Sequence, residues 1–289
     1  MSYTRVGVVT GANKGIGLAI VRNLALQYPK SPLNNGPLLI YLTARDNTKG
    51  EEALRSLQQD SQLTKAKALT SDGGLAEIKY HTLDIADSKS IASFAEYLQN
   101  THGDGVDFII NNAGIAMQGF DANVVKTTLG CNYYGTLEAS NTFLPRLKET
   151  GRLVNLGSMS GHLNSQFSDA VREDFLASKT VPDVTKLMER FTSAVEAGNE
   201  KKQGWPSAEY AVSKSGVIGM TRAVAAAEKA KGSKVLINSC CPGWVQTDMT
   251  KGKGAKTPDE GAKTPVMLAL EDIGGRSGLF WQHERPIDW

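Results

Sequence analysis

The sequence predicts an α/β fold: a doubly wound parallel sheet of seven strands with helices on both faces and one helical insertion. Two observations carry this prediction. Short apolar runs alternate with longer amphipathic segments along the whole chain, and several of the short runs are apolar throughout. A strand with no polar face is covered on both sides, as in parallel sheets whose connections are helices.

Seven short apolar runs are expected to be the strands. They occupy residues 6–9, 38–42, 78–83, 106–110, 153–156, 235–239 and 279–281. The helix-like segments between them cover about residues 15–28, 48–59, 88–100, 123–147, 208–231 and 259–270. Strand, helix and strand repeated in this order give parallel pairing within one sheet.

Two stretches exceed this minimal pattern. Residues 64–74 are polar and end in glycine, so we expect a mobile surface loop before the third strand. Residues 162–204 are longer, and helical spacing predicts one or two added helices there, with apolar positions at Val184, Leu187, Met188, Phe191 and Val195. This insertion is too short to bury a core of its own, so residues 1–289 are expected to form a single domain.

The composition is that of an ordinary globular protein. The chain has 289 residues, of which 40% are hydrophobic, and a formal net charge of +2. The apolar fraction is enough for a core, and the weak net charge gives no field that would attract nucleic acid. We therefore expect no nucleic-acid partner.

Cysteine usage and the apolar pattern indicate the compartment. The cysteines are Cys131, Cys240 and Cys241, and neither they nor the four histidines have a spacing typical of a metal site. No metal is expected, and the few cysteines favour a reducing compartment. The first residues lack the pattern of a signal peptide, and no apolar run approaches the roughly 20 residues that span a bilayer. We expect a cytoplasmic protein with no membrane partner.

A glycine-rich turn follows the first expected strand directly. It reads TGANKGIG over residues 10–17, with glycines at Gly11, Gly15 and Gly17. Glycines between a strand and a helix let the backbone approach a pyrophosphate, which the N–H groups at the helix N-terminus then bind. An ordinary turn that happens to use glycine is the alternative, but the position after the first strand of a doubly wound pattern favours a dinucleotide site.

The end of the second expected strand indicates which dinucleotide binds. An NAD-preferring site has an acidic side chain there to bind the ribose 2′-OH, whereas this chain has Ala44 followed by Arg45. Lys14 lies in the glycine turn, and two cations near one point fit a 2′-phosphate. Asp46 weakens this case slightly, and both cations could instead be solvated surface charges. The expected cofactor is NADP(H) rather than NAD(H).

Five motifs in order resemble the short-chain dehydrogenase/reductase family. They are TGANKGIG (10–17), LDIAD (83–87), NNAG (111–114), YAVSK (210–214) and CPGWVQTDM (241–249), and the resemblance covers almost the whole chain. It implies a Rossmann-type fold. It also implies a cofactor site built from Gly11, Asn13, Lys14, Gly15, Ile16, Gly17, Arg45, Asp84, Ile85, Asn112, Ala113, Gly114, Tyr210, Lys214, Pro242, Gly243, Trp244, Val245, Thr247, Asp248 and Met249.

Further stretches are similar to the NADPH-dependent carbonyl reductases within that family. These stretches are LTARD (42–46), CNYYGT (131–136), GWPSAEYAVSKSG (204–216) and CCPGWVQTDM (240–249). Such relatives carry an extra helical segment before the tyrosine, and the 52 positions between Ser158 and Tyr210 leave room for it. The resemblance implies a monomer, because in those relatives the insertion covers a face that is used elsewhere for dimerisation.

Tyr210 and Lys214 are the expected centre of the chemistry. They are four residues apart and therefore share one face of a helix. The ammonium of Lys214 should favour the phenolate and lower the pKa of Tyr210, which makes the phenol a better proton donor to an alkoxide. In isolation, such a pair is more often ordinary surface decoration. Its position after the insertion is what the resemblance requires.

The resemblance assigns roles to two more residues. Ser158 follows the fifth expected strand and would donate a hydrogen bond to the substrate oxygen, with Ser160 as a nearby competitor. Asn132 would hold a water that links Lys214 to solvent, although a helical asparagine could equally be an exposed polar position. The catalytic set is thus Asn132, Ser158, Tyr210 and Lys214, with hydride passing from NADPH to a carbonyl carbon.

The substrate is expected to be an aldehyde, a ketone or a quinone. Its pocket could be walled by apolar and aromatic residues, although core packing is as good an interpretation for each: Trp244, Met249, Met159, His162 and Trp205. Two alternative functions remain, an NADP-dependent secondary alcohol dehydrogenase and a non-catalytic NADP-binding redox sensor. A sensor would be expected to lack Tyr210, Lys214 or Ser158, and all three are present.

Overall fold

A computed structural model describes residues 3–289 and contains the predicted α/β architecture. One sheet runs through the molecule in the order β3-β2-β1-β4-β5-β6-β7-β8. Its strands are β1 (Arg5–Val9), β2 (Leu38–Ala44), β3 (Ala76–Thr82), β4 (Val106–Asn111), β5 (Leu147–Leu156), β6 (Leu236–Cys241), β7 (Phe280–Gln282) and β8 (Arg285–Ile287). The first seven pair in parallel, which confirms the predicted doubly wound sheet.

The sheet has one strand more than the seven predicted. The short strand β8 turns back and pairs antiparallel with β7. It spans only three residues, contains Pro286 and is largely exposed, so no apolar run in the sequence marks it. A proline and polar residues are typical of an edge strand.

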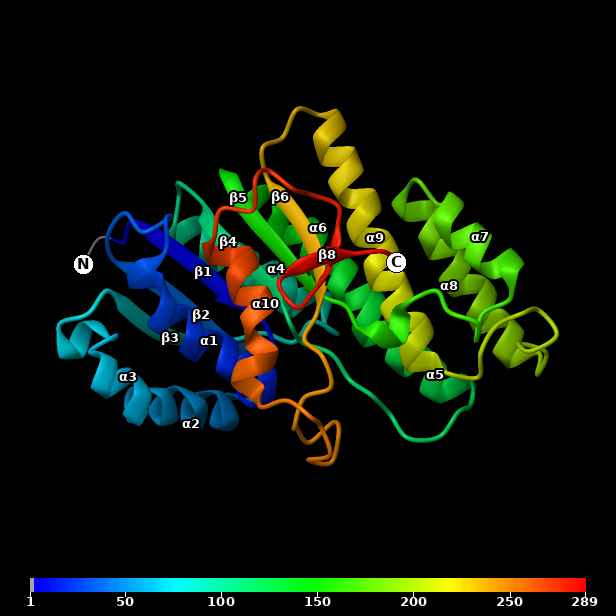
Figure 1. The fold of residues 1–289 in the computed structure, drawn as a ribbon, viewed down its shortest axis with the longest axis horizontal. Helices are drawn as coiled ribbons and strands as arrows, with labels where there is room; N and C mark the ends of the chain where they lie inside the picture. The colour runs from blue at the N-terminus through cyan, green and yellow to red at the C-terminus, as the bar shows by residue number, and fades with distance from the viewer. Residues whose placement is uncertain (1–2) are drawn as a thin grey trace.

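Two helical layers cover the sheet (Figure 1). One layer contains α1 (Gly15–Gln27), α2 (Asn47–Gln58), α3 (Ser61–Ala66) and α10 (Pro258–Leu270), and it shares a core with one face of the central strands. The other contains α4 (Ser88–Thr101), α6 (Thr136–Phe143) and the long α9 (Glu209–Ala230), which pack on the opposite face. Successive strand residues such as Val8 and Val9 point into different cores, as the two-residue period of a strand requires.

The insertion forms two helices, α7 (Asp169–Ala177) and α8 (Val181–Glu196), as predicted. Figure 1 shows them outside the sheet, next to α9. They share a third core with α9 and α5 (Ala122–Leu129). Four of the predicted apolar positions are fully buried in that core and Val195 packs at its edge. The insertion therefore rests on the helix that carries Tyr210.

Residues 64–74 contain more regular structure than their polarity predicts. They contain the end of α3 and a short 3-10 turn, η2 (Thr70–Asp72). Most of the stretch is exposed, as expected, but Ala68 and Leu69 are only 2% and 5% exposed. These two apolar residues anchor the stretch against the core of the α1 layer.

The predicted helix over 123–147 is broken into segments. After α5, residues Gly130–Gly135 form a π-helix, η3, before α6 begins at Thr136. A 3-10 turn, η4 (Leu144–Arg146), then leads into β5, which starts at Leu147 rather than at residue 153. The π-helix holds Asn132, and such interruptions often occur at functional sites. No helix formed by residues 3–289 has both the length and the apolar character that crossing a membrane requires.

Candidate active site

The glycine-rich turn lies where the order of the strands reverses. β1 pairs with β2 on one side and with β4 on the other, so the chain beyond the carboxyl ends of β1 and β4 borders the crevice that binds ligands in such sheets. Gly11 has a φ of +62°, which glycine adopts without strain, and a Cβ there would lie 2.8 Å from Ala113 Cα. A Cβ on Gly17 would lie 2.5 Å from Asn112 Nδ2. The turn is therefore packed too closely at Gly11 and Gly17 for a side chain at either position.

The helix that follows this turn offers unpaired N–H groups. α1 has no side-chain hydrogen bond at its N-cap, Lys14, and no acidic residue in its first turn. By contrast, an aspartate, serine or threonine side chain caps each of α2, α3, α4, α5, α7, α8 and α10. Free N–H groups and a bare dipole end behind a glycine cradle fit a pyrophosphate. The residues present thus fit a dinucleotide.

The surroundings of Arg45 fit a 2′-phosphate better than a free 2′-OH. Asp46 directly follows Arg45 in the sequence, and its side chain caps α2 by accepting from Lys49 N at 3.0 Å. A carboxylate that caps a helix has less capacity to bind a ribose hydroxyl. Ala44 at the end of β2 is buried and Arg45 is exposed. The presence of Asp46 is therefore a weaker argument against a 2′-phosphate site than it was from the sequence alone.

Lys14 has a partner that the sequence did not indicate. Its ammonium lies 2.6 Å from Asp248 Oδ2. Lys14 also holds the pKa of the Asp248 carboxyl below its usual range. The methyl group of Thr247 packs over Gly15, 3.3 Å from the position of an added Cβ. Residues 247–248 therefore lie directly over the glycine turn, so that two predicted cofactor residues contact each other.

The ends of β3 and β4 bring further predicted residues to this crevice. Asn112 donates from Nδ2 to the carbonyl oxygens of Thr10 and Gly11, at 2.8 and 3.0 Å, which fixes the NNAG segment against the glycine turn. Ala113 N donates to Thr10 Oγ1 at 3.0 Å. Two further members of the predicted cofactor set follow β3: Asp84 is half-buried in an Asx turn, and Ile85 is buried.

The segment after β6 has one buried anchor and two exposed apolar side chains. Val245 is 2% exposed and packs against Gly261 and Ile16, so it fixes the segment to α10 and α1. Trp244 and Met249 are 60% and 47% exposed. Of the remaining predicted members of the cofactor set, Asn13 lies in the glycine-rich turn, and Pro242 and Gly243 begin the segment after β6.

Tyr210 and Lys214 lie together in the first turns of α9. The ammonium of Lys214 is 5.7 Å from the centroid of the Tyr210 ring. Lys214 is buried, with 6% exposure, and donates to the carbonyl oxygen of Leu156 at 2.8 Å. Its contact with the end of β5 fixes α9 against the crevice. The two groups thus share a helix face, as their spacing predicted.

The expected direction of the Tyr210 pKa was wrong for this arrangement. Burial raises the pKa of Tyr210 to about 12, the neighbouring Cys241 adds to the rise, and the nearby Ser158 hydroxyl opposes it. Burial also lowers the pKa of Lys214 to about 8. The ammonium is directed at the Leu156 carbonyl and lies near the ring, which is why it does not outweigh burial. At neutral pH the phenol holds its proton and can donate it.

Ser158 lies beside the phenol, at the end of β5. Its hydroxyl is close enough to Tyr210 to lower the pKa of the phenol, and it accepts from Ser160 N at 3.1 Å in a short 3-10 turn, η5 (Met159–Gly161). That turn packs on α9, since a Cβ on Gly161 would lie 2.5 Å from the carbonyl carbon of Lys214. Ser160 is exposed and does not share this contact. The geometry therefore favours Ser158 over Ser160.

Asn132 is not an exposed polar residue. It is 1% exposed, and its side chain both accepts from Ile115 N and donates to Ile115 O, each at 2.8 Å. A Cβ added to Gly114 would lie 3.1 Å from Asn132 Oδ1 and 3.6 Å from Lys214 Nζ. Asn132 and Lys214 therefore approach the same point from two elements, which is the arrangement that a relay through Lys214 requires.

A buried polar network fixes the strands and the helix beneath the site. Asn155 in β5 accepts from Asn111 Nδ2 at 2.9 Å and donates to Thr221 Oγ1 of α9 at 2.9 Å. All three residues are at most 3% exposed. This network links β4, β5 and α9, the three elements that carry or support the predicted catalytic residues. Nothing in the sequence pairs these positions.

Cys241 lies beside the proposed catalytic residues. Its sulfur accepts from Met159 N and from Gly243 N, each at 3.3 Å, and is 3.8 Å from Gln282 Nε2. It influences the pKa of both Tyr210 and Lys214. Cys241 thus contacts the turn after β5, the segment after β6 and the end of β7.

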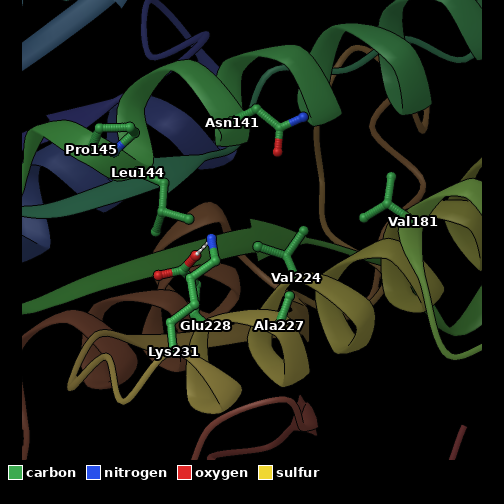
Figure 2. A pocket seen from close by; sticks show the side chains of 8 residues that line it. All are labelled: Asn141, Leu144, Pro145, Val181, Val224, Ala227, Glu228 and Lys231. Atoms are coloured by element: carbon green, nitrogen blue, oxygen red, sulfur yellow. Dashed lines mark hydrogen bonds and ion pairs between the residues drawn. The ribbon is translucent and has the colours of Figure 1, made fainter.

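The five residues considered for the substrate pocket divide in two. Trp205 is 2% exposed and packs on Phe175 and Phe191 in the core of the insertion, so the pocket interpretation was wrong for it. The other four lie at the loops after β5 and β6: Met159, His162, Trp244 and Met249. A groove of about 440 Å³ lies elsewhere, between the end of α6 and the last turns of α9, and Figure 2 shows that none of the predicted site residues line it.

The comparisons with known proteins agree with this geometry. The family model described as "short chain dehydrogenase" matches residues 5–171 and 192–258, and the chain belongs to that family. The gap between the matched ranges falls within the two-helix insertion.

Individual relatives are similar over the whole chain. The sequence is 38% identical to carbonyl reductase (NADPH) 1 of Homo sapiens, over 100% of this chain and 99% of that protein. It is 36% identical to carbonyl reductase (NADPH) 3 of Mus musculus, over 93% and 92% of the two chains. Among solved structures, salutaridine reductase from Papaver somniferum has a TM-score of 0.81 at 25% identity and covers 96% of this chain and 99% of its own.

Proposed function

We propose that this protein is an NADPH-dependent carbonyl reductase that converts aldehydes, ketones or quinones to alcohols. The observation that carries the proposal is the convergence of Ser158, Tyr210 and Lys214 beside the glycine-rich turn of a dehydrogenase fold. The similarity to carbonyl reductases along the full chain supports it.

The protein's own residues orient the substrate oxygen and supply a proton. NADPH, when bound, supplies the hydride. Ser158 lies close enough to Tyr210 to influence its pKa, and the two hydroxyls would share the carbonyl oxygen of the substrate, where negative charge develops. The Tyr210 phenol, protonated at neutral pH, gives that oxygen its proton. Lys214 lies next to the phenol with a pKa of about 8, so it can exchange a proton in the physiological range.

The cofactor site is proposed to extend from the glycine turn to the segment after β6. Gly11, Gly17 and the uncapped start of α1 fit the pyrophosphate. Arg45 and Lys14 would bind the 2′-phosphate, for which Lys14 must release Asp248. Asn132 would hold the water of a proton relay from Lys214, which its position opposite Gly114 supports.

We also propose a cytoplasmic, monomeric protein that consists of one domain. The insertion shares its core with α5 and α9, which supports a single domain. The same helices cover one side of α9, which supports a monomer. Nucleic acid is not proposed as a partner, because the formal net charge is only +2.

A substrate panel tests the proposal. Purified protein is mixed with aldehydes, ketones and quinones, and the loss of NADPH absorbance is followed, with NADH in parallel. We expect oxidation of NADPH that depends on the carbonyl compound and is at least about ten-fold more efficient than with NADH. NADPH oxidation no faster than without a carbonyl compound would refute the proposal, and a preference for NADH would refute the cofactor assignment.

A further inference from the structure

The segment that follows β6 is positively charged. Residues 243–256 contain Lys251, Lys253 and Lys256 against the single carboxylate of Asp248, which gives the segment a charge of +2. The segment also carries the exposed side chains of Trp244 and Met249. An anion that approaches this edge of the active site therefore meets a local excess of positive charge.

Lys256 lies against Gly243, at the start of this segment. It is half-buried, and a Cβ added to Gly243 would lie 3.0 Å from its Cδ and 3.1 Å from its Nζ. Gly243 N in turn donates to Cys241 Sγ, and Cys241 is close enough to Tyr210 to influence its pKa. Two intervening residues, Gly243 and Cys241, thus connect Lys256 to the phenol.

The ammonium of Lys256 has no carboxylate partner among residues 3–289. Its polar contact is with His283 Nδ1 at 3.1 Å. Because an ammonium only donates, Nδ1 accepts and the proton of the neutral imidazole is on Nε2. Glu260 caps α10 by accepting from Thr257 N at 2.7 Å, and its hydrogen bonds to Thr257 and, less strongly, the nearby charge of Lys256 lower its pKa. Lys256 is thus a half-buried cation that makes no salt bridge among residues 3–289, and its ammonium is available to an anion.

His283 is fixed in place by its turn. His283 and Glu284 have φ values of +52° and +60°, so they form the tight connection between β7 and the antiparallel β8. Glu284 N donates to Thr264 Oγ1 at 3.3 Å, which ties the turn to α10. Left-handed backbone at non-glycine residues is uncommon. The backbone turn that carries His283 is thus held by contacts with β7, β8 and α10.

We propose that Lys256, supported by His283, selects carbonyl substrates that carry a carboxylate next to an apolar body. The exposed indole of Trp244 and the side chain of Met249 would contact the apolar body, and Lys256 would bind the carboxylate. Lys251 and Lys253 add to the attraction over a longer range. The inference rests on the proposed function, because it names the class of substrate for the same site.

Paired substrates test this selection. 4-Formylbenzoate and its methyl ester present the same aldehyde with and without a negative charge. The ratio of their kcat/KM values, at saturating NADPH, is measured for wild type, Lys256→Met and Lys256→Arg. Methionine keeps the packing of the stem on Gly243 and removes the charge, and Lys65→Met on α3 is the control for loss of an exposed lysine.

We expect Lys256→Met to lower the ratio of kcat/KM for the acid to kcat/KM for the ester about five-fold. In Lys256→Arg and Lys65→Met the same ratio should stay within about two-fold of wild type. In wild type, added salt should reduce kcat/KM for the acid more than for the ester. An unchanged ratio in Lys256→Met together with equal salt effects on both substrates would overturn the inference and leave the proposed function intact. If the wild-type protein reduced no carbonyl compound at all, the proposed function itself would fail.

Discussion

Replacing Lys214 by methionine is expected to stabilise the protein while removing a proposed catalytic group. Lys214 is 6% exposed and has no carboxylate partner among the described residues 3–289, so its charge is held in a poor environment. Burial lowers its pKa from 10.5 to about 8. Residues that serve a reaction often reduce stability in this way, and a neutral side chain of similar length removes the penalty.

The pKa of Lys214 gives the size of the effect. Each unit of pKa is worth about 1.4 kcal/mol, so the fall from 10.5 to about 8 corresponds to roughly 3 kcal/mol against the charged lysine. Methionine cannot donate to the Leu156 carbonyl, and the loss of that hydrogen bond costs about 1 kcal/mol. The net expectation at pH 7 is a free energy of unfolding that is about 2 kcal/mol higher in Lys214→Met than in wild type.

The gain should depend on pH in a definite direction. Below about pH 8 the lysine is charged in both the folded and the unfolded state, and wild type bears the full penalty. Between about pH 8 and 10.5 the unfolded state binds more protons than the folded state, so the stability of wild type rises with pH. The advantage of Lys214→Met should therefore shrink across this range and disappear near its upper end.

Urea denaturation of nucleotide-free protein between pH 7 and pH 10 measures this difference. Lys229→Met, an exposed lysine on the same helix, is the matched control and should stay within about 0.5 kcal/mol of wild type at every pH. If Lys214→Met were less stable than wild type at pH 7, or if its advantage did not change with pH, the reasoning about the buried charge would be refuted.

Three further predictions concern the cofactor and the polar network. Asp248→Asn removes the ion pair with Lys14, so it should tighten the binding of NADPH about two- to three-fold and leave the binding of NADH unchanged in a fluorescence titration. Weaker binding of NADPH would contradict the idea that Asp248 and the 2′-phosphate compete for Lys14. The double variant Lys14→Ala, Arg45→Ala should raise Kd for NADPH at least about ten-fold and spare NADH, whereas equal losses would refute the 2′-phosphate assignment. Asn155→Ala should lower the free energy of unfolding by about 2–4 kcal/mol. A double-mutant cycle with Thr221→Val should give a coupling free energy of about 1 kcal/mol, and a coupling near zero would show that their hydrogen bond does not contribute to stability.

Apolar patterning predicted the fold well because the strands are covered on both faces. Runs such as residues 38–42 and 106–110 lie inside β2 and β4, and both strands are buried at every position. The same patterning failed where the signal was too short or ambiguous. β8 is largely exposed, and the π-helix at Asn132 spans only six residues, too few to leave a periodicity of its own in the sequence.

Contacts between distant residues and the effects of burial were beyond the sequence. Lys14 and Asp248 are 234 positions apart, and nothing local to either residue indicates the other. The four-residue spacing correctly put Tyr210 and Lys214 on one helix face, but it said nothing of the burial that raises the pKa of Tyr210. A pKa depends on the balance of desolvation and nearby charge, which only the packed structure provides.

Proton donation by Tyr210 is tested most directly by Tyr210→Phe, which removes one oxygen atom and keeps the ring. The rate of a single turnover with saturating NADPH and a reducible aldehyde is measured beside the Kd for NADPH. We predict a fall in rate of at least about 10³-fold, a magnitude set by loss of both the proton donor and one hydrogen bond to the developing oxyanion, with Kd changed less than about three-fold. A variant that turned over within about ten-fold of wild type would show that the proton comes from elsewhere.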